Sequence, residues 1–463
     1  MGIRLKINRN IIIALIMTVF TMLISVLINI VCPGDYKIAL DVVWTACFSV
    51  VLIAVFDRLI LSLNTMFIVF ASWMIRLVLI PIDIVTGIAR QPDQFSFFES
   101  AVRYVNSEPV SNIQRYTYVL AKEFQVFGTN LFLAKLFNAF LGMLGLAVIM
   151  NCMLKLDIKL RIYNAITLMA ALSPMSILLS VTVLRESIYY LFVVLSFNYF
   201  IEWTMDCSKF DFILSNVLLL PVVWLHGGYI FIAGAYVWMF LINQRGDSLK
   251  RIFSKASIFI LAIVLIVALV SMSALTYLRI FSGNNLSGMV DVLVEYVERS
   301  NGTNARGDSA YLLWTLNVSG IREIIIYTPF RMIYFLISPV LWNVRGIEDL
   351  IVVFSDSLIF LLAFAKGFSF KRNKRIGLFS IKEVYDRYSA IIACGLFAIV
   401  LISLPFGWGT ITAGTAVRHR NCLLPIALLV IAVAEEYIER AREHRNVESC
   451  RDDQVCMQDA VGD

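Results

Sequence analysis

Charge is scarce in this chain. Only 16% of its 463 residues are Asp, Glu, Lys or Arg, three are His, and 60% are hydrophobic, with a mean hydropathy of +0.81. A soluble globular protein cannot bury that much apolar surface. The composition therefore excludes a soluble domain and predicts an all-α polytopic integral membrane protein.

Several motifs of known chemistry are also missing. The eight cysteines include no CxxC pair and no metal-ligand spacing, so we interpret them as apolar fillers. The chain has no Gly-rich nucleotide loop and no HExxH motif, and no DxD motif falls on its predicted outer face. These absences argue against a nucleotide-sugar enzyme. We expect no cofactor, no bound metal and no nucleic-acid partner.

Long apolar runs are what the chain has instead. A spanning helix needs about 20 predominantly apolar residues. We predict twelve spans, at residues 10–31, 38–56, 61–85, 129–150, 162–184, 187–204, 212–225, 229–242, 256–278, 347–365, 389–406 and 422–437. They form one membrane domain over 1–439, and a disordered cytoplasmic tail follows over 440–463. Any relation of this domain to GT-C folds is loose. The first run is too long for a cleavable signal peptide and is expected to remain as an anchor.

Loop charges decide the orientation. With the N-terminus cytoplasmic, the basic loop 155–161 lies inside. Counting residues 327–342 as a further span would place the loop 366–387, with its seven Lys and Arg, outside. We therefore treat 327–342 as re-entrant or surface-lying. Both termini are then cytoplasmic, and the long outer loops are 86–128 and 279–346.

The predicted outer face has almost no Lys. It carries twelve Arg but only Lys37 and Lys122, whereas the inner face carries thirteen Arg and ten Lys. Arg presents a planar fork that binds phosphate or carboxylate in bidentate fashion. The asymmetry favours an oxyanion-binding outer face, although long translocated loops also escape the positive-inside rule.

Two charged clusters mark the outer ends of predicted spans. Arg185 and Glu186 occupy a turn where ionised groups are costly unless paired or wet, so they form either an ion pair or a cation and a carboxylate for substrate. In GTAVRHRN, Arg418, His419 and Arg420 precede the last span. Two arginines at a predicted helix start are unfavourable without an anion, and such a position suits a phosphate; the alternative is that both snorkel to the surface.

The first outer loop supplies carboxylates. Asp93 and Glu99 flank aromatic residues, and the apolar residues of the stretch fall on one helix face: Phe97, Phe98, Val102 and Val105. The spacing predicts an amphipathic surface helix. A carboxylate there is a candidate general base for a sugar hydroxyl, the alternative being a solvated loop acid.

Further polar residues lie deeper. Arg76 and Asp83 are seven residues apart, so they share a helix face, and we expect an ion pair or an outer-end contact. Lys135 is expected to reach toward the outer site. His226, in a tight outer turn, is interpreted as a structural histidine.

Four segments resemble a known family. SPMSILLSVTVLRESIYYLFVVLSF, FRMIYFLISPVLWNV, GTAVRHRNCLLPIALL and DQFSFFESAV resemble, in order and spacing, segments of bacterial Wzy-type polymerases, which join oligosaccharide repeat units into O-antigen or capsule. The resemblance implies a metal-independent glycosyltransferase in the bacterial cytoplasmic membrane. Two polyprenyl-diphosphate-linked oligosaccharides would meet at its outer face, with a chain-length regulator and a flippase as protein partners.

The resemblance also implies roles for site residues. Arg418, Arg420 and Arg185 would bind the leaving diphosphate, and His419 would donate a hydrogen bond to it or orient a carboxylate. The acceptor proton would go to one of the two acids, Glu186 or Asp93, and the sequence does not choose between them.

Two other functions stay open. A GT-C glycosyltransferase with a polyprenyl-phosphate sugar donor shares the outer acid, but its acids usually follow the first helix, whereas Asp93 follows three spans. A flippase or transporter for lipid-linked sugars usually places polar groups near the membrane midplane, whereas here the charges gather at one edge.

Overall fold

The structure, a computed structural model, describes residues 37–89, 92–110, 113–243, 312, 315, 318, 320–373, 382–410 and 412–459. Every helix or strand element within these ranges is a helix, which confirms the all-α prediction for the described part of the chain. The predicted spans 10–31 and 256–278 lie outside the described residues, as does most of the predicted loop 279–346.

The first half of the chain contains α2 (Lys37–Phe56), α3 (Leu63–Thr86), α4 (Pro92–Val105), α5 (Arg115–Phe127), α6 (Leu131–Lys155), α7 (Leu160–Leu172), α8 (Pro174–Ser180), α9 (Glu186–Asp206), α10 (Lys209–Val217), α11 (Leu220–Leu225), η1 (Gly227–Tyr229) and α12 (Ile230–Asn243). The second half contains α16 (Ile321–Ile337), η3 (Leu341–Asn343), α17 (Ile347–Val352), the π-helical turn η4 (Val353–Ser357), α18 (Leu358–Asn373), α19 (Lys382–Gly409), α20 (Ala413–Asn421) and α21 (Leu424–Asp459).

Between five and seven membrane spans can be assigned within the described ranges. The helices α2, α3, α6, α9 and residues 386–409 of α19 are each long and apolar enough to cross a membrane. Two bent pairs, α7 with α8 (47°) and α20 with α21 (61°), each qualify as one broken span. A multi-pass membrane protein is thereby supported, while the number twelve and the side of the termini stay predictions.

Three helix breaks share one cause. Pro174, Pro221 and Pro425 each occupy the first turn of the helix that follows a break, in α8, α11 and α21. A proline lacks the N–H that would continue a helix, and its ring clashes with the carbonyl four residues earlier. The predicted span 212–225 is consequently divided into α10 and α11.

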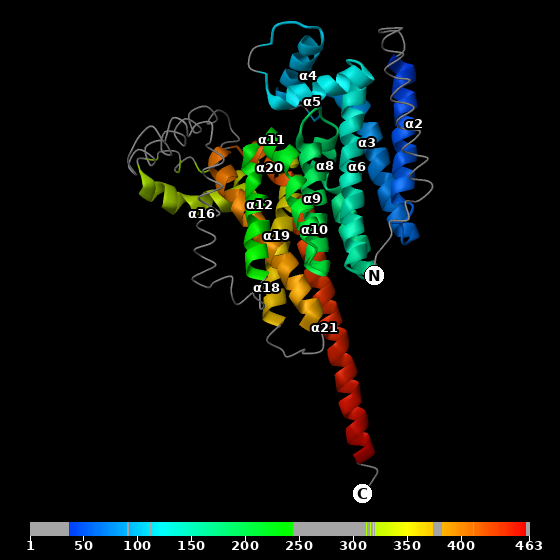
Figure 1. The fold of residues 1–463 in the computed structure, drawn as a ribbon, viewed down its shortest axis with the longest axis vertical. Coiled ribbons are helices and arrows are strands. Elements are labelled where there is room, and N and C mark those ends of the chain that lie inside the picture. Colours follow the sequence, from blue (N-terminus) through cyan, green and yellow to red (C-terminus); the bar gives the residue numbers. More distant parts are fainter. Residues whose placement is uncertain are drawn as a thin grey trace.

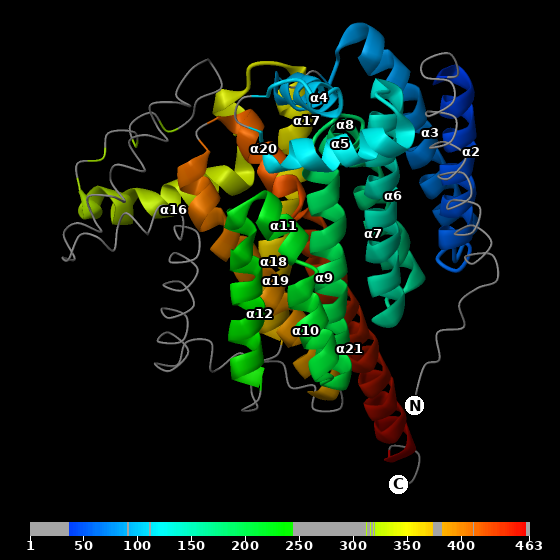
Figure 2. The same cartoon turned by 45° about the horizontal axis from the view of Figure 1, so that its top comes forward.

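The core of the bundle is built around α21. Figures 1 and 2 show α6, α9, α12, α18 and α19 running along one axis, with α2 and α3 on one side. Every residue from Leu424 to Ala434 is buried among these helices. Helices α6 and α9 approach closely at Gly145, where an added Cβ would lie 2.5 Å from the Tyr190 ring. Small residues permit such close helix packing in membranes.

Helices α4 and α5 form a cap that lies across one end of the bundle, at the top of Figure 1. The Phe97 ring packs edge-on against Tyr116 at 5.1 Å between centroids, and Phe98 packs against Phe124 at 5.2 Å. Phe97 is buried, whereas Glu99 is exposed. The predicted amphipathic surface helix is thus confirmed as α4.

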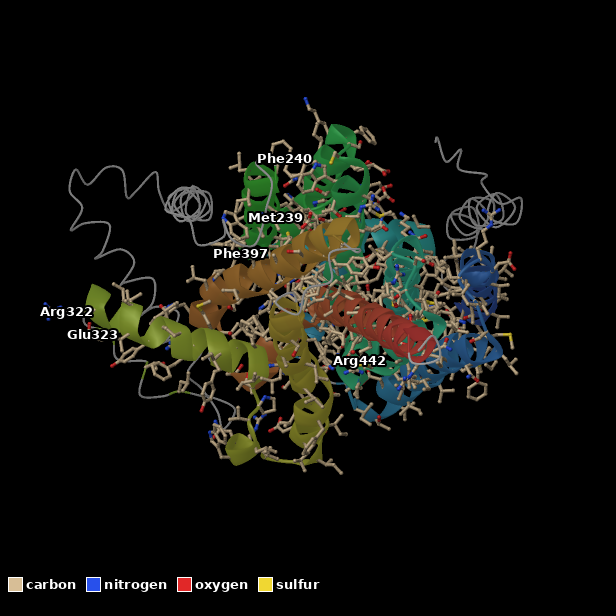
Figure 3. All side chains as sticks on the ribbon, turned by 90° about the horizontal axis from the view of Figure 1, so that it is seen from below. Met239, Phe240, Arg322, Glu323, Phe397 and Arg442 are labelled. Carbon is tan, nitrogen blue, oxygen red and sulfur yellow. The ribbon has the colours of Figure 1, made fainter. Side chains whose placement is uncertain are left out.

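Helix α16 covers the segment whose status as a span the sequence left undecided. It lies sideways to the bundle axis in Figure 1, and Figure 3 shows Arg322 and Glu323 at its far end, away from α12 and α19. It is not among the helices that qualify as spans. This orientation agrees with the treatment of 327–342 as a segment that does not cross.

The C-terminal tail differs from its prediction. Helix α21 continues to Asp459, so the backbone of residues 440–459 is helical where a disordered tail was expected. At the point where the tail leaves the bundle, Arg440 Nε donates to Glu436 Oε1 at 2.5 Å, an i,i+4 pair that supports the helix.

The segments that the sequence assigns to the outer face gather at one end. Helices α4, α5, α8, α11 and α20 all lie toward the top of Figure 1, and α20 packs against both α8 and α9. The turn that contains Arg185 and Glu186 joins α8 to α9 at this end. Residues distant in sequence therefore meet beneath the cap.

Candidate functional site

The turn between α8 and α9 places Arg185 and Glu186. Its residues Val181, Val183 and Leu184 are fully buried, so the turn is fixed inside the protein. Asn138 of α6 supports it, because its side-chain amide donates to the carbonyl of Thr182 at 2.7 Å and to that of Leu184 at 3.0 Å. Sequence reasoning did not single out Asn138.

Arg418 joins the two predicted acids. Its Nε and Nη2 both donate to Glu186 Oε1, at 3.1 and 3.0 Å, and its Nη1 donates to Asp93 Oδ2 at 2.8 Å. The side chains are 9% exposed for Arg418, 1% for Glu186 and 55% for Asp93. Three predicted site residues from three distant segments are thus brought together, with the acid of the cap as the accessible member.

Arg185 lies beside this cluster without a carboxylate partner among the described residues. Its guanidinium is 5.9 Å above the Phe97 ring and 5.8 Å from the Tyr189 ring, and its Nε has no hydrogen-bond partner. Aromatic faces stabilise a cation less than an anion would. Arg185 is therefore an available cation under the cap.

Other buried polar atoms around Arg418 also lack partners in the described structure. They are Glu186 Oε2, His419 Nδ1, Tyr189 Oη, Ser187 Oγ and Asn421 Oδ1. Buried polar groups are nearly always hydrogen-bonded, and a concentration of unpaired ones needs an explanation such as an absent ligand or water. The clustering of these atoms at residues 186–189 and 419–421 marks the same place as the Arg418 contacts.

His419 is directed into an aromatic cluster. Its ring lies 4.7 Å from that of Phe406 and 5.2 Å from that of His226, and its carbonyl accepts a hydrogen bond from Tyr229 Oη at 3.1 Å. Among the described residues, no hydrogen bond or ion pair joins its ring to the carboxylate of Asp93 or Glu186. Burial, with Arg185 nearby, lowers the pKa of His226 to about 4, so that this neighbour is neutral at pH 7.

Arg420 faces away from Arg418. Residues two apart on a helix point about 200° apart around its axis. The Arg420 side chain is fully buried, and it donates to the Phe335 carbonyl at 3.1 Å and to Ser357 Oγ at 2.9 Å. The expected joint clamp of Arg418 and Arg420 on one ligand is therefore not formed in this structure.

The helix position of these arginines also differs from the prediction. Arg418, His419 and Arg420 lie in the last turn of α20, where a helix terminus favours cations. The chain then bends before α21 begins at Leu424, because the ring of Pro425 is incompatible with a helical carbonyl at Asn421. The prediction that an anion binds because these arginines begin a helix is therefore wrong. The carboxylates of Glu186 and Asp93 offset the charge of Arg418.

Of the two expectations for Arg76 and Asp83, the ion pair is wrong, whereas Asp83 does make a contact at the cap end of α3. Arg76 Nε donates to Ser180 Oγ at 3.0 Å, and Asp83 pairs with Lys135 at 2.5 Å. Lys135 Nζ also lies 3.4 Å from Gln94 Oε1, so Lys135 does reach the cap, as predicted. Gln94 adjoins Asp93 in α4, which links this buried pair to the Arg418 cluster.

No group of three or more His, Cys, Asp or Glu residues in the described ranges is placed to hold a metal ion. Comparisons of the chain with protein-family models, with curated proteins and with solved structures found no match.

Proposed function

We propose that this protein is a polymerase that transfers a growing oligosaccharide from its polyprenyl diphosphate to a hydroxyl of a second lipid-linked repeat unit. The observation that carries the proposal is the cluster in which Arg418 binds Glu186 and Asp93 while Arg185 lies nearby without an anion. The family resemblance supplies the substrate class.

The leaving diphosphate needs cations. An arginine has five N–H donors, and Arg418 uses three of them on the two carboxylates. Arg185 and the remaining donors of Arg418 would bind the diphosphate oxygens as charge develops on them. Because Asp93 is exposed on a separate cap helix, a diphosphate that competes for Arg418 releases this carboxylate first.

Released Asp93 suits the role of general base better than Glu186. A base must be within reach of the incoming hydroxyl, and the Asp93 side chain is 55% exposed against 1% for Glu186. The acceptor hydroxyl attacks the anomeric carbon, its proton passes to Asp93, and the bond to the diphosphate oxygen breaks. Glu186, which accepts two N–H groups on one oxygen, holds Arg418 in position.

The cap end would face outward from the bacterial cytoplasmic membrane. At the end of the bundle away from the cap, Lys155 is the last residue of α6 and pairs with Glu202, and Lys159 directly precedes α7. Lysine-rich ends are typical of cytoplasmic faces. The reaction would then take place where exported lipid-linked repeat units arrive.

A transporter of lipid-linked sugars is the second candidate. Asp356, 3% exposed, accepts from Ser173 Oγ at 2.8 Å, next to Ser357, which accepts from Arg420. These contacts join the α7–α8 break to the π-helical turn. Buried charges at discontinuous helices are typical of transport sites.

An in-vitro assay separates these functions. Purified full-length protein in nanodiscs, given the lipid-linked repeat unit that accumulates in cells lacking the gene, should produce a ladder of polymer and free polyprenyl diphosphate, also with EDTA present. Transfer of one sugar from a polyprenyl monophosphate would indicate the GT-C alternative. Movement across liposomes without a ladder would indicate the transporter.

A further inference from the structure

A cavity lies beside the Arg418 cluster, between the end of α3, the start of α4 and the start of α6. Its volume is about 220 Å³. The residues that define its chemistry are Asp83, Thr86, Gln94, Phe95, Phe98 and Lys135. The mechanism proposed above uses none of them.

The polar floor of the cavity is electrically neutral. Lys135 Nζ binds Asp83 at 2.5 Å and the Val181 carbonyl at 3.2 Å, and Asp83 Oδ1 accepts from the Ala89 amide at 2.6 Å. Both charges are therefore offset within the protein. A phosphate would find no surplus cation here, whereas a neutral hydroxylated group brings no charge that must be desolvated and needs only hydrogen-bond partners.

Gln94 provides a directed hydrogen-bonding group. Gln94 is 3% exposed and lines the cavity, and its Oε1 accepts a hydrogen bond from Lys135 Nζ at 3.4 Å. Its Nε2 has no partner among the described residues. The amide can therefore donate to a ligand that enters the cavity.

The walls are aromatic, and apolar residues are exposed at the edge of the cavity. Phe95 and Phe98 line one side, and Ile84 and Val85 of α3 are 42% and 85% exposed at the edge. Ligand sites are usually apolar clefts with a few placed polar groups. Aromatic rings on one side and an amide on the other suit a sugar ring carried on a lipid.

We propose that this cavity is the subsite for the hydroxyl-bearing sugar of the acceptor repeat unit. The inference rests on the proposed polymerase function and names its second substrate site. Gln94 directly follows Asp93 on the cap helix, so the proposed subsite lies next to the segment that carries the general base. The diphosphate donor occupies the arginine side of the same cap helix.

A single-transfer assay tests this assignment. The donor is the lipid-linked repeat unit with its acceptor hydroxyl methylated, and the acceptor is the same oligosaccharide on a short alkyl chain. Gln94→Ala and Phe95→Ala should each raise the KM for the acceptor roughly tenfold and leave the KM for the donor unchanged, while Gln125→Ala on the exposed face of α5 changes neither. Equal changes in both constants, or none, would overturn the subsite.

Thiol protection gives a readout that needs no turnover. In Thr86→Cys, modification by N-ethylmaleimide is followed at that peptide by mass spectrometry. The alkyl oligosaccharide should slow the modification at least threefold, and Gln94→Ala should abolish the effect. Protection without a polymer ladder would support the sugar site and contradict the polymerase function. A ladder without protection would contradict the sugar site and leave the polymerase function supported.

Discussion

The Arg418 guanidinium lies 2.8 Å from the Asp93 carboxylate, although 325 positions separate the two residues in the chain. The contact joins α20, at the end of the bundle, to the cap helix α4. Because Asp93 is exposed and Arg418 is nearly buried, the contact closes the cap over Arg185, Glu186 and His419.

Replacement of Arg418 by Lys tests whether the fork geometry matters. An ammonium keeps the charge but cannot direct three N–H groups at two carboxylates. We expect Arg418→Lys to lower polymer formation about 100-fold, with Arg322→Lys at the exposed end of α16 as the control. A rate within about threefold of wild type would show that only the charge is needed.

Two amide variants assign the general base. Asp93→Asn should lower kcat about 10²- to 10⁴-fold and leave the KM for the donor near its wild-type value, because an amide cannot accept the proton. Glu186→Gln should mainly raise that KM, since Arg418 loses its charged partner. Single-turnover rates measure the first effect and initial rates the second. The opposite pattern would make Glu186 the base.

The buried Lys135–Asp83 pair should be strongly coupled. Lys135→Met leaves an uncompensated carboxylate, and such a change typically costs about 3–5 kcal/mol. The double variant Lys135→Met/Asp83→Asn should recover most of that stability. Thermal unfolding in detergent, read by intrinsic fluorescence, gives both values. Additive losses in the double variant would show that the pair contributes no mutual stabilisation.

Acid should destabilise the protein through His226. Its pKa in the folded protein is about 4, below the value of about 6.5 for an unfolded histidine. Between these values the unfolded chain binds more protons, so the free energy of unfolding falls as pH drops from 6.5 to 4, by up to about 3 kcal/mol. His226→Asn should show a flatter profile of melting temperature against pH. A profile as steep as that of wild type would locate the titration elsewhere.

Part of this site could be predicted from sequence. Charges next to long apolar runs are rare and costly, so Arg185, Glu186 and Arg418 are recognisable from the amino-acid sequence alone. Counting predicted spans from the N-terminus also assigned these three residues and Asp93 to the same face of the membrane. Apolar spacing further predicted the amphipathic cap helix, since Phe97 and Phe98 share one face of it.

The contacts themselves could not be predicted, for physical reasons. Arg418 and Arg420 look equivalent in the sequence, but the helical repeat points them to opposite sides. The ring of Pro425 breaks the helix before α21, so the two arginines lie at the end of α20 and not at the start of the last helix. The partner of Asp83 depends on how α6 packs beside α3, and no spacing within one helix reveals Lys135.

The most direct test of the site is equilibrium binding of polyprenyl diphosphate to the purified protein. Arg185→Ala and Arg418→Ala should each raise the Kd roughly tenfold or more, because each removes charge-assisted hydrogen bonds. Arg322→Ala should leave the Kd unchanged, and polyprenyl monophosphate should bind more weakly than the diphosphate. Wild-type affinity in both Arg185→Ala and Arg418→Ala would contradict the assignment of these residues to the leaving diphosphate.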